Sequence, residues 1–331
     1  MQDSLFSETE SATATVRAAE HPRALHELAA ALPAQLRLGG SSWSYPGWAG
    51  HVWDREYPES TLSRYGLVAY SKHPLFRTVS LDRAFYRPLS VAQYALYAAQ
   101  VPADFRFVVK APSIVTDALI RDEDGRGMKV NASFLDADVA LRACVEPTLE
   151  GLGSKLGALV FQISPLPVHW FAQMPKLIDR LHALLQRMPY LCDIAPDAVV
   201  AVEVRDAQWL TPEFVLALRE TGATYCIGLH AKMPRIAEQL PILRALWPGP
   251  LVCRWNLNPL HGVYGYEEAE RQYEPFDRMH DPDVETRNAL AKVIAGTLKG
   301  GQNAYVTLSN QAEGCGPLSA IELAQVVRGL L

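Results

Sequence analysis

The chain has 331 residues, of which 49% are hydrophobic and 20% are charged, and its formal net charge is −5. This is enough apolar material for one large core, and the acidic balance provides no global basic field for nucleic acid, although a local basic cleft is not excluded. The five cysteines are odd in number and include no CxxC pair, which argues against a disulfide framework or a thiolate zinc site and fits a reducing cytoplasm.

Residues 1–20 are rich in Ser, Thr, Glu and Ala, and we predict that they form a disordered tail. They contain no apolar segment typical of a secretory signal. No run of about 18 apolar residues occurs anywhere in the chain, so we expect no membrane span and a cytoplasmic location. A short helix is predicted over His21–Leu32, and residues 21–331 are expected to form a single domain.

From residue 36 onward, short β-rich runs alternate with helical ones. The predicted strands are Leu36–Gly40, Phe76–Asp82, Phe105–Lys110, Ala158–Ile163, Val199–Arg205, Thr224–Leu229, Leu251–Asn256 and Ala304–Ser309. The predicted helices are Leu62–Lys72, Val91–Ala99, Phe134–Leu149, Trp170–Met188, Pro212–Thr221, Ile236–Trp247, Val284–Lys299 and Leu318–Leu330. Eight strands, each followed by a helix, indicate an α/β fold, a (β/α)8 TIM-type barrel with parallel strands.

A doubly wound sheet is the alternative fold, but it more often has five to seven strands and a glycine-rich first turn. The first turn here, Gly39-Gly40-Ser41-Ser42, does not match GxGxxG, and we predict no cofactor. Two long segments after strand ends, Ile120–Met128 and His261–Asp283, are expected to be binding loops or plain surface insertions.

Alternation of side chains along the strands sorts out which of them face the barrel lumen. In Val199–Arg205, Glu203 and Arg205 share one face and the valines 202 and 204 share the other, which sends the charged pair inward. The same reasoning on four further strands places at the mouth Asp82, Lys110, Gln162, Arg254 and Asn256. Polar groups at the carboxyl ends of barrel strands are typical of a functional site, although each alone could be a structural ion pair.

These residues limit the chemistry of the expected site. Lys110, Arg205 and Arg254 are cations suited to a phosphate or a carboxylate. Glu203 is the first candidate for a general acid/base and Asp82 for its partner carboxylate, so we predict Glu203, Lys110 and Asp82 as catalytic residues. The amides are predicted to bind the ligand, orienting hydroxyls or a carbonyl: Gln162, Asn256 and Asn310.

Aromatic residues follow the first predicted strand. Trp43 and Tyr45 are predicted to stack on a flat ligand such as a sugar or a base, whereas Trp48 more readily closes over the core. No HExxH or other ligand cluster appears, so no metal is predicted, and the absence of GxSxG argues against a serine nucleophile.

Several of these segments together resemble a known family. They are Leu36–Trp48, Val79–Ser90, Phe105–Pro112, Leu152–Gln162, Ala201–Trp209 and, more loosely, Cys253-Arg254 and Ser309–Gly316. The chain from Leu36 to the C-terminus resembles the YecE-like family, the domain of unknown function numbered 72. The resemblance implies a TIM-type barrel, adds Tyr86 and Trp209 to the expected ligand-binding residues, and implies no activity, because the reaction of that family is not established.

The chain departs from the family pattern at the mouth. Ser80 stands where the family usually has Glu, Asp82 where it has Asn, Asn256 where it has His, and Ser309 where it has Asn. These departures are expected of a divergent member that has changed its substrate or lost catalysis.

Three function classes follow from these observations. The first is an enzyme that acts on an anionic, phosphorylated or sugar-like small molecule by general acid/base chemistry. The second is a non-catalytic binding or partner protein, and the third is a nucleic-acid-processing barrel, which the net charge disfavours. The sequence indicates no membrane partner and no particular oligomeric state.

Overall fold

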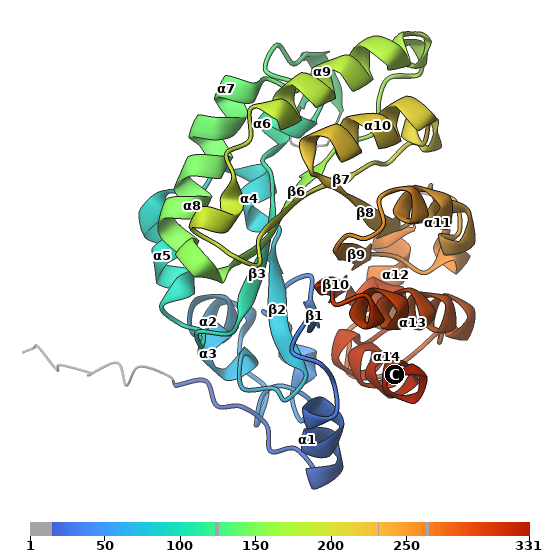
Figure 1. Cartoon of the computed structure of the whole chain (residues 1–331). Coiled ribbons are helices and arrows are strands. Elements are labelled where there is room, and N and C mark those ends of the chain that lie inside the picture. The colour runs from blue at the N-terminus through green and yellow to red at the C-terminus, as the bar shows by residue number, and fades with distance from the viewer. Residues whose placement is uncertain (1–14, 123–125, 231, 263–264) are drawn as a thin grey trace, which may run out of the picture.

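Eight parallel strands close into a barrel in the computed structural model, which describes residues 15–122, 126–230, 232–262 and 265–331 (Figure 1). Around the barrel the strands follow the order β1-β10-β9-β8-β7-β6-β3-β2. Their bounds are β1 Leu36–Gly40, β2 Phe76–Leu81, β3 Arg106–Lys110, β6 Leu156–Gln162, β7 Val199–Glu203, β8 Thr224–Leu229, β9 Leu251–Trp255 and β10 Ala304–Leu308. The predicted (β/α)8 barrel and its eight predicted strands are confirmed.

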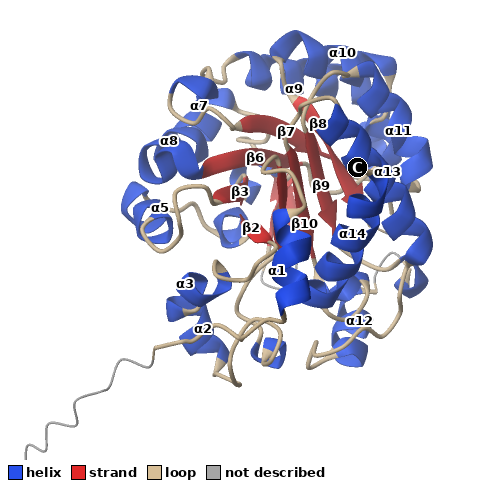
Figure 2. Cartoon of the chain, turned by 60° about the horizontal axis from the view of Figure 1, so that its bottom comes forward, coloured by secondary structure: helices blue, strands red, loops and turns tan. Residues whose placement is uncertain are grey.

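Helices surround the strands, as Figure 2 shows from a second direction. They are α1 Arg23–Ala30, α2 Glu59–Tyr65, α3 Leu67–Tyr70, α4 Arg83–Tyr86, α5 Val91–Ala98, α6 Ser113–Thr116, α7 Ala137–Ala140, α8 Glu146–Leu152, α9 Met174–Gln186, α10 Pro212–Thr221, α11 Ile236–Ala245, α12 Tyr266–Tyr273, α13 Val284–Lys299 and α14 Gly316–Leu330. Local signals fix several ends. Helix α10, for example, begins where the Thr211 side chain accepts from the Phe214 amide and ends at Gly222, whose φ is 69°.

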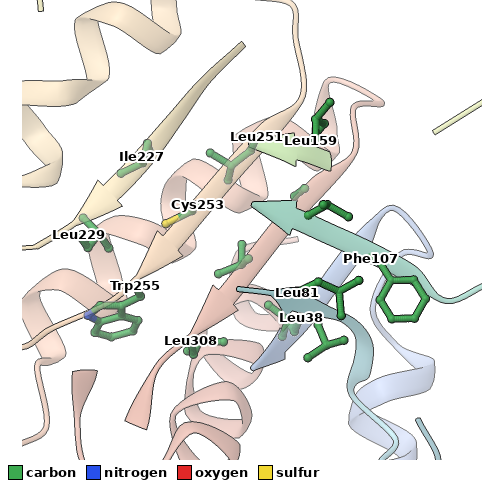
Figure 3. Close-up of a cluster of buried hydrophobic side chains, with 14 of the residues drawn as sticks. Leu38, Leu81, Phe107, Leu159, Ile227, Leu229, Leu251, Cys253, Trp255 and Leu308 are labelled. Atoms are coloured by element: carbon green, nitrogen blue, oxygen red, sulfur yellow. The ribbon is translucent and has the colours of Figure 1, made fainter. Parts of the chain in front are cut away.

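Strand alternation divides the core into two parts. One buried cluster fills the lumen and consists of Val108, Ala158, Val160, Ala201, Cys226, Val252 and Tyr305. The residues between them face outward and pack under the helices, as Leu81, Leu159, Cys253 and Trp255 do in Figure 3. Because Arg254 lies between two outward residues of β9, its side chain must point into the lumen, as the sequence predicted.

Charged side chains close the barrel at the amino ends of the strands. Asp197 Oδ2 forms ion pairs with Arg37 Nη2 at 2.9 Å and with Arg106 Nη2 at 2.7 Å. The Tyr305 hydroxyl donates to the Asp197 carbonyl at 2.8 Å, and Arg37 Nη1 donates to the Asp104 carbonyl at 2.8 Å. We call Arg37, Arg106, Asp197 and Tyr305 the floor cluster. Together with the packed lumen above it, this cluster makes the barrel a filled core and not a pore.

The pairing of β1 with β2 shifts register between Leu38 and Gly39. At this irregularity a Cβ on Gly39 would lie 1.8 Å from the Thr78 carbonyl oxygen, so only glycine fits there. The buried Tyr70 hydroxyl accepts from the Gly40 amide at 2.6 Å and donates to the Thr78 carbonyl at 3.0 Å. One side chain from α3 thus replaces the hydrogen bonds that the two strands do not make to each other.

The amino-terminal segment corrects one prediction. Residues 15–20, expected to belong to the disordered tail, lie against the barrel, since Val16 is buried and Ala18 forms an antiparallel bridge with Trp53. The Ala19 amide also donates to the Val52 carbonyl at 2.9 Å. Two small apolar side chains in a polar stretch are enough to dock it, a contact that composition alone does not reveal. The rest of the expected tail, residues 1–14, lies outside the described residues.

The two long segments expected to be loops contain secondary structure. Strands β4 (Leu119–Arg121) and β5 (Gly127–Val130) form an antiparallel pair, and α12 lies within the segment 261–283. Residues 123–125 of the first and 263–264 of the second lie outside the described residues. All five cysteines are free thiols. In the described part of the chain, no helix combines the length and the apolar character needed to cross a membrane.

Candidate functional site

One guanidinium, that of Arg254, joins two carboxylates from different strands at the mouth of the barrel. Its Nη1 donates to Glu203 Oε2 at 2.8 Å and its Nη2 donates to Asp82 Oδ2 at 2.5 Å. Arg254 is 3% exposed and Glu203 is fully buried, whereas the Asp82 side chain is 31% exposed. Solvent therefore reaches this group of charges on the side of Asp82.

A second guanidinium completes the network. Arg205, two residues after the end of β7, contacts Glu203 Oε1 through its Nη2 at 2.8 Å. The same nitrogen donates to Gln162 Oε1 at 3.0 Å, which also accepts from Arg254 Nη1 at 3.3 Å. Two buried donors, Arg205 Nη1 and Arg254 Nε, have no partner among the described residues. Because a buried donor without a partner costs free energy, these atoms are candidates for contact with a bound acceptor.

Lys110 ends β3 on the lumen side and is 8% exposed. Its Nζ lies 3.6 Å from the centre of the Phe85 ring in α4. Burial lowers the pKa of Lys110 to about 7, helped by the neighbouring guanidinium groups of Arg254 and Arg205, while the Asp82 carboxylate acts in the opposite direction. The amine consequently changes its protonation near neutral pH, unlike an ordinary lysine.

The two carboxylates behave differently. Burial alone would raise the pKa of Glu203, but Arg205 and Arg254 outweigh burial and hold it below its usual value. The pKa of Asp82 is lowered in the same way, against burial, by Arg254, Lys110 and the Ser80 hydroxyl. Both groups are therefore ionised at neutral pH, and neither is suited to hold a proton there.

Three of the four residues expected to depart from the family pattern, Ser80, Asp82 and Asn256, take part in this network. The Ser80 hydroxyl donates to Asp82 Oδ1 at 2.5 Å. Asn256 Nδ2 donates to Glu203 Oε1 at 3.4 Å and to the Arg254 carbonyl at 3.1 Å. Ser309 instead caps a short 3-10 turn by accepting from the Gln311 amide. Ser80 and Asn256 thus orient the carboxylates, whereas Ser309 shapes the chain after β10.

The structure brings seven of the predicted residues into one group, which we call the mouth cluster: Asp82, Lys110, Gln162, Glu203, Arg205, Arg254 and Asn256. Tyr45 lies beside it, half-buried between the rings of Trp48 and Phe276 at centroid distances of 4.8 and 5.5 Å. Burial raises the pKa of Tyr45 to about 12, opposed by a hydrogen bond with Ser41 and assisted by the negative charge of Asp82. The phenol therefore stays protonated at neutral pH.

Four other predicted residues lie outside the mouth cluster. The Trp43 indole is buried and donates to the Leu62 carbonyl at 3.1 Å, and Trp209 is buried against Phe214. Asn310 Oδ1 accepts from Trp48 Nε1 at 3.0 Å and from the Gly316 amide at 2.9 Å. Tyr86, on the barrel rim, is 81% exposed. Trp43, Trp209 and Asn310 hold the barrel wall together in this arrangement, and only Tyr86 is open to a ligand.

Two residues that the sequence prediction missed border the mouth cluster. His230 follows β8, and its ring lies 5.2 Å from that of Tyr266 in α12. Burial, followed by the positive charge of Arg205, lowers the pKa of His230 to about 4, so the imidazole is neutral at physiological pH. The aromatic character of the segment 261–283 was the one signal that pointed to Tyr266.

Two cavities lie beside strands β8 and β9, at opposite ends of these strands. One of about 550 Å³ lies at the carboxyl ends of β8 and β9 and is lined in part by His230, Met233 and Asn258. It adjoins the mouth cluster through His230. The other, of about 730 Å³, lies between α11 and α13 and contains no residue of the mouth cluster. Among the described residues, no three His, Cys, Asp or Glu side chains are grouped as metal ligands.

A family model described as a protein of unknown function, DUF72, matches residues 37–330. The chain belongs to the DUF72 family. The crystal structure of a DUF72 family protein from Enterococcus faecalis is similar over 88% of this chain and 95% of that one, with 17% identity and a TM-score of 0.56. One from Thermotoga maritima is similar over 88% and 98%, with 20% identity and a TM-score of 0.53. No curated protein matches the chain. These DUF72 structures share its fold, and at such identities the likeness carries no activity with it.

Proposed function

We propose that this DUF72 protein is an enzyme that acts on an anionic small molecule, phosphorylated or sugar-like, by general acid/base chemistry at the mouth of the barrel. The observation that carries the proposal is the meeting of Lys110, Arg205 and Arg254 with Glu203 and Asp82 at the carboxyl ends of different strands. In this fold, that end of the barrel is where active sites lie.

The preference for an anion follows from the charges of the mouth cluster. Three cations, Lys110, Arg205 and Arg254, face two carboxylates, which leaves one positive charge in excess when Lys110 is protonated. Arg205 Nη1 is a buried donor without a partner among the described residues. A phosphate or carboxylate oxygen placed at Arg205 Nη1 would accept a hydrogen bond from this donor and would also neutralise the excess positive charge.

The proton-transfer role fits Lys110 better than Glu203. Glu203 is ion-paired on both oxygens, to Arg205 and to Arg254, and its pKa lies below the usual value. Lys110 has a pKa of about 7, which suits a general base or acid at physiological pH. We therefore assign Glu203 and Asp82 to positioning the guanidinium groups and Lys110 to moving the proton.

A screen of sugar phosphates and sugars, combined with calorimetric titration, tests this proposal. Lys110→Met is expected to lower turnover by at least about 100-fold, because the proton-transfer group is lost. The variant should keep most of its affinity for the anionic ligand, because Arg205 remains. Arg205→Gln should weaken the binding of inorganic phosphate and of ribose 5-phosphate. Lys176→Met, on the exposed face of α9, is the matched control. Unchanged turnover in Lys110→Met, or unchanged phosphate affinity in Arg205→Gln, would contradict the proposal.

A non-catalytic binding protein is the second candidate function, favoured by the mutual pairing within the mouth cluster. Glu203, Arg254 and Gln162 are all buried and hydrogen-bond to one another, as residues of a structural network do. A protein of this kind would bind the same anions but turn over none of them. Its ligand affinity would be the same in Lys110→Met as in the unchanged protein at a pH above 8, where the amine is neutral.

A further inference from the structure

Lys110 differs from every other buried lysine or arginine in the described part of the chain. The others are Arg37, Arg205, Arg254 and Arg287, and each has a carboxylate oxygen at 2.9 Å or closer. Lys110 forms no ion pair with a described residue within 4.0 Å, and its Nζ lies over the face of Phe85. Charge pairing, the usual reason for a cation to be buried, accounts for four of these five residues and leaves Lys110 unexplained.

The nearby acidic groups are already engaged. Asp82 shares its carboxylate between the Arg254 guanidinium and the Ser80 hydroxyl, and Glu203 is held by two arginines. The face of Phe85 favours the ammonium form, but a ring replaces only part of the hydration that burial removes. The balance lowers the pKa of Lys110 to about 7, so a large fraction of the amine is neutral at physiological pH. A neutral, desolvated amine is a nucleophile.

We propose that the Lys110 amine forms an imine with a carbonyl group of the ligand, which makes the substrate class an aldehyde or ketone that carries an anionic group. This inference rests on the proposed function and narrows its substrate. The anionic group would meet Arg205 Nη1, one of the two donors of the mouth cluster that are buried and have no hydrogen-bond partner among the described residues. The carbonyl carbon would lie at Lys110 Nζ, on the side of the cluster that solvent reaches at Asp82.

The atoms of this step balance without an oxidant or a reductant. The amine lone pair attacks the carbonyl carbon, and the carbonyl oxygen takes up a proton from the amine through water to give a carbinolamine. The hydroxyl group then takes up one proton from solvent and leaves as water, and the nitrogen lone pair forms the C=N bond that replaces the C=O bond. The protonated imine carries the positive charge that the ammonium carried before. Asp82, whose carboxylate already opposes the lowering of the Lys110 pKa, stabilises that charge.

Reductive trapping of the full-length protein tests the inference. The protein is incubated with ribose 5-phosphate, dihydroxyacetone phosphate or pyruvate in the presence of sodium cyanoborohydride, which reduces an imine to a stable secondary amine. Peptide mapping by mass spectrometry then measures the modified fraction of each lysine. Lys110 is expected to be modified at least tenfold faster than the exposed Lys176 of α9, with at least one of these probes. Its labelling should rise with pH around a midpoint near 7.

Controls separate this inference from the proposed function. Excess inorganic phosphate should slow the labelling of Lys110 but not that of Lys176, and Lys110→Arg should abolish the fast labelling while keeping a positive charge at the site. Labelling of Lys110 no faster than that of Lys176 with all three probes overturns the imine. If phosphate binding persists in that case, the proposed function stands, whereas loss of both overturns both. Because the mapping uses the unchanged protein, the result does not depend on whether a variant folds.

Discussion

Arg254 Nη1 and Glu203 Oε2 lie 2.8 Å apart in the lumen, and the two side chains are 3% and 0% exposed. An ion pair without water around it is strongly coupled, since removing one charge leaves the other buried and unpaired. Glu203 also serves Arg205, so its carboxylate compensates two guanidinium groups. The stability of the mouth therefore depends strongly on this carboxylate, which Asp82 supplements at Arg254 alone.

The first prediction concerns that dependence. Glu203→Gln should lower the free energy of unfolding by about 3–5 kcal/mol in urea denaturation, because the buried Arg205 loses its counter-charge and the buried Arg254 keeps only Asp82. The matched control is Glu285→Gln, since Glu285 pairs with Arg235 at 3.0 Å but both side chains are 77% exposed. An exposed pair should contribute less than about 1 kcal/mol. Equal effects from the two substitutions would show that the mouth cluster is not electrostatically coupled.

The second prediction concerns stability against pH. In the folded protein the pKa of Lys110 is about 7, whereas an unfolded lysine has a pKa of about 10.4. The buried ammonium thus destabilises the fold fully below pH 7, and this destabilisation fades as the pH rises from 7 toward 10.4. Lys110→Met should raise the free energy of unfolding by at least about 1 kcal/mol at pH 6, and by less at pH 9. A gain that is larger at pH 9 than at pH 6 would contradict the assignment.

The third prediction concerns the floor cluster. Asp197 pairs with both Arg37 and Arg106, whose side chains are 9% and 13% exposed. Asp197→Asn is expected to cost about 1–3 kcal/mol of stability in thermal or urea unfolding. Asp138→Asn provides the control, because its pair with Arg187 is 57–59% exposed. If Asp197→Asn and Asp138→Asn had the same unfolding midpoint, the ion pairs of the floor cluster would not contribute to stability.

The fourth prediction concerns the irregular pairing of β1 with β2. Tyr70→Phe removes the hydroxyl that accepts from the Gly40 amide and donates to the Thr78 carbonyl, and leaves both backbone groups buried without a partner. The expected loss is about 1–3 kcal/mol, measured by urea denaturation. Tyr65→Phe is the control, because Tyr65 is 42% exposed. Equal stability of the two variants would show that the Tyr70 hydroxyl is not needed to satisfy the backbone groups of Gly40 and Thr78.

Strand alternation predicted the larger part of the site. On β7 and β9 the residues next to Glu203 and Arg254 are apolar, so the side on which each charge lies follows from period two alone. The resemblance of the sequence motifs to the YecE-like family implied the same barrel fold. The alternation identifies the inward face of each strand, and seven predicted residues meet there.

The remaining features depend on chain segments without a period. Nothing in the sequence places Phe85 over Lys110, or Tyr266 beside His230, because the paths of the segments after β2 and β9 are set by tertiary contacts. Trp43 and Asn310 show the opposite error. Trp43 was expected to stack on a ligand and Asn310 to orient one, yet backbone and indole groups of the wall engage their polar atoms in the fold.

The floor cluster and the packed lumen above it limit the route to the mouth cluster. Arg37, Arg106, Asp197 and Tyr305 are bonded across the amino ends of the strands, and a filled core separates them from the mouth. The substrate and the product of any reaction at Lys110 would therefore enter and leave on the same side of the barrel.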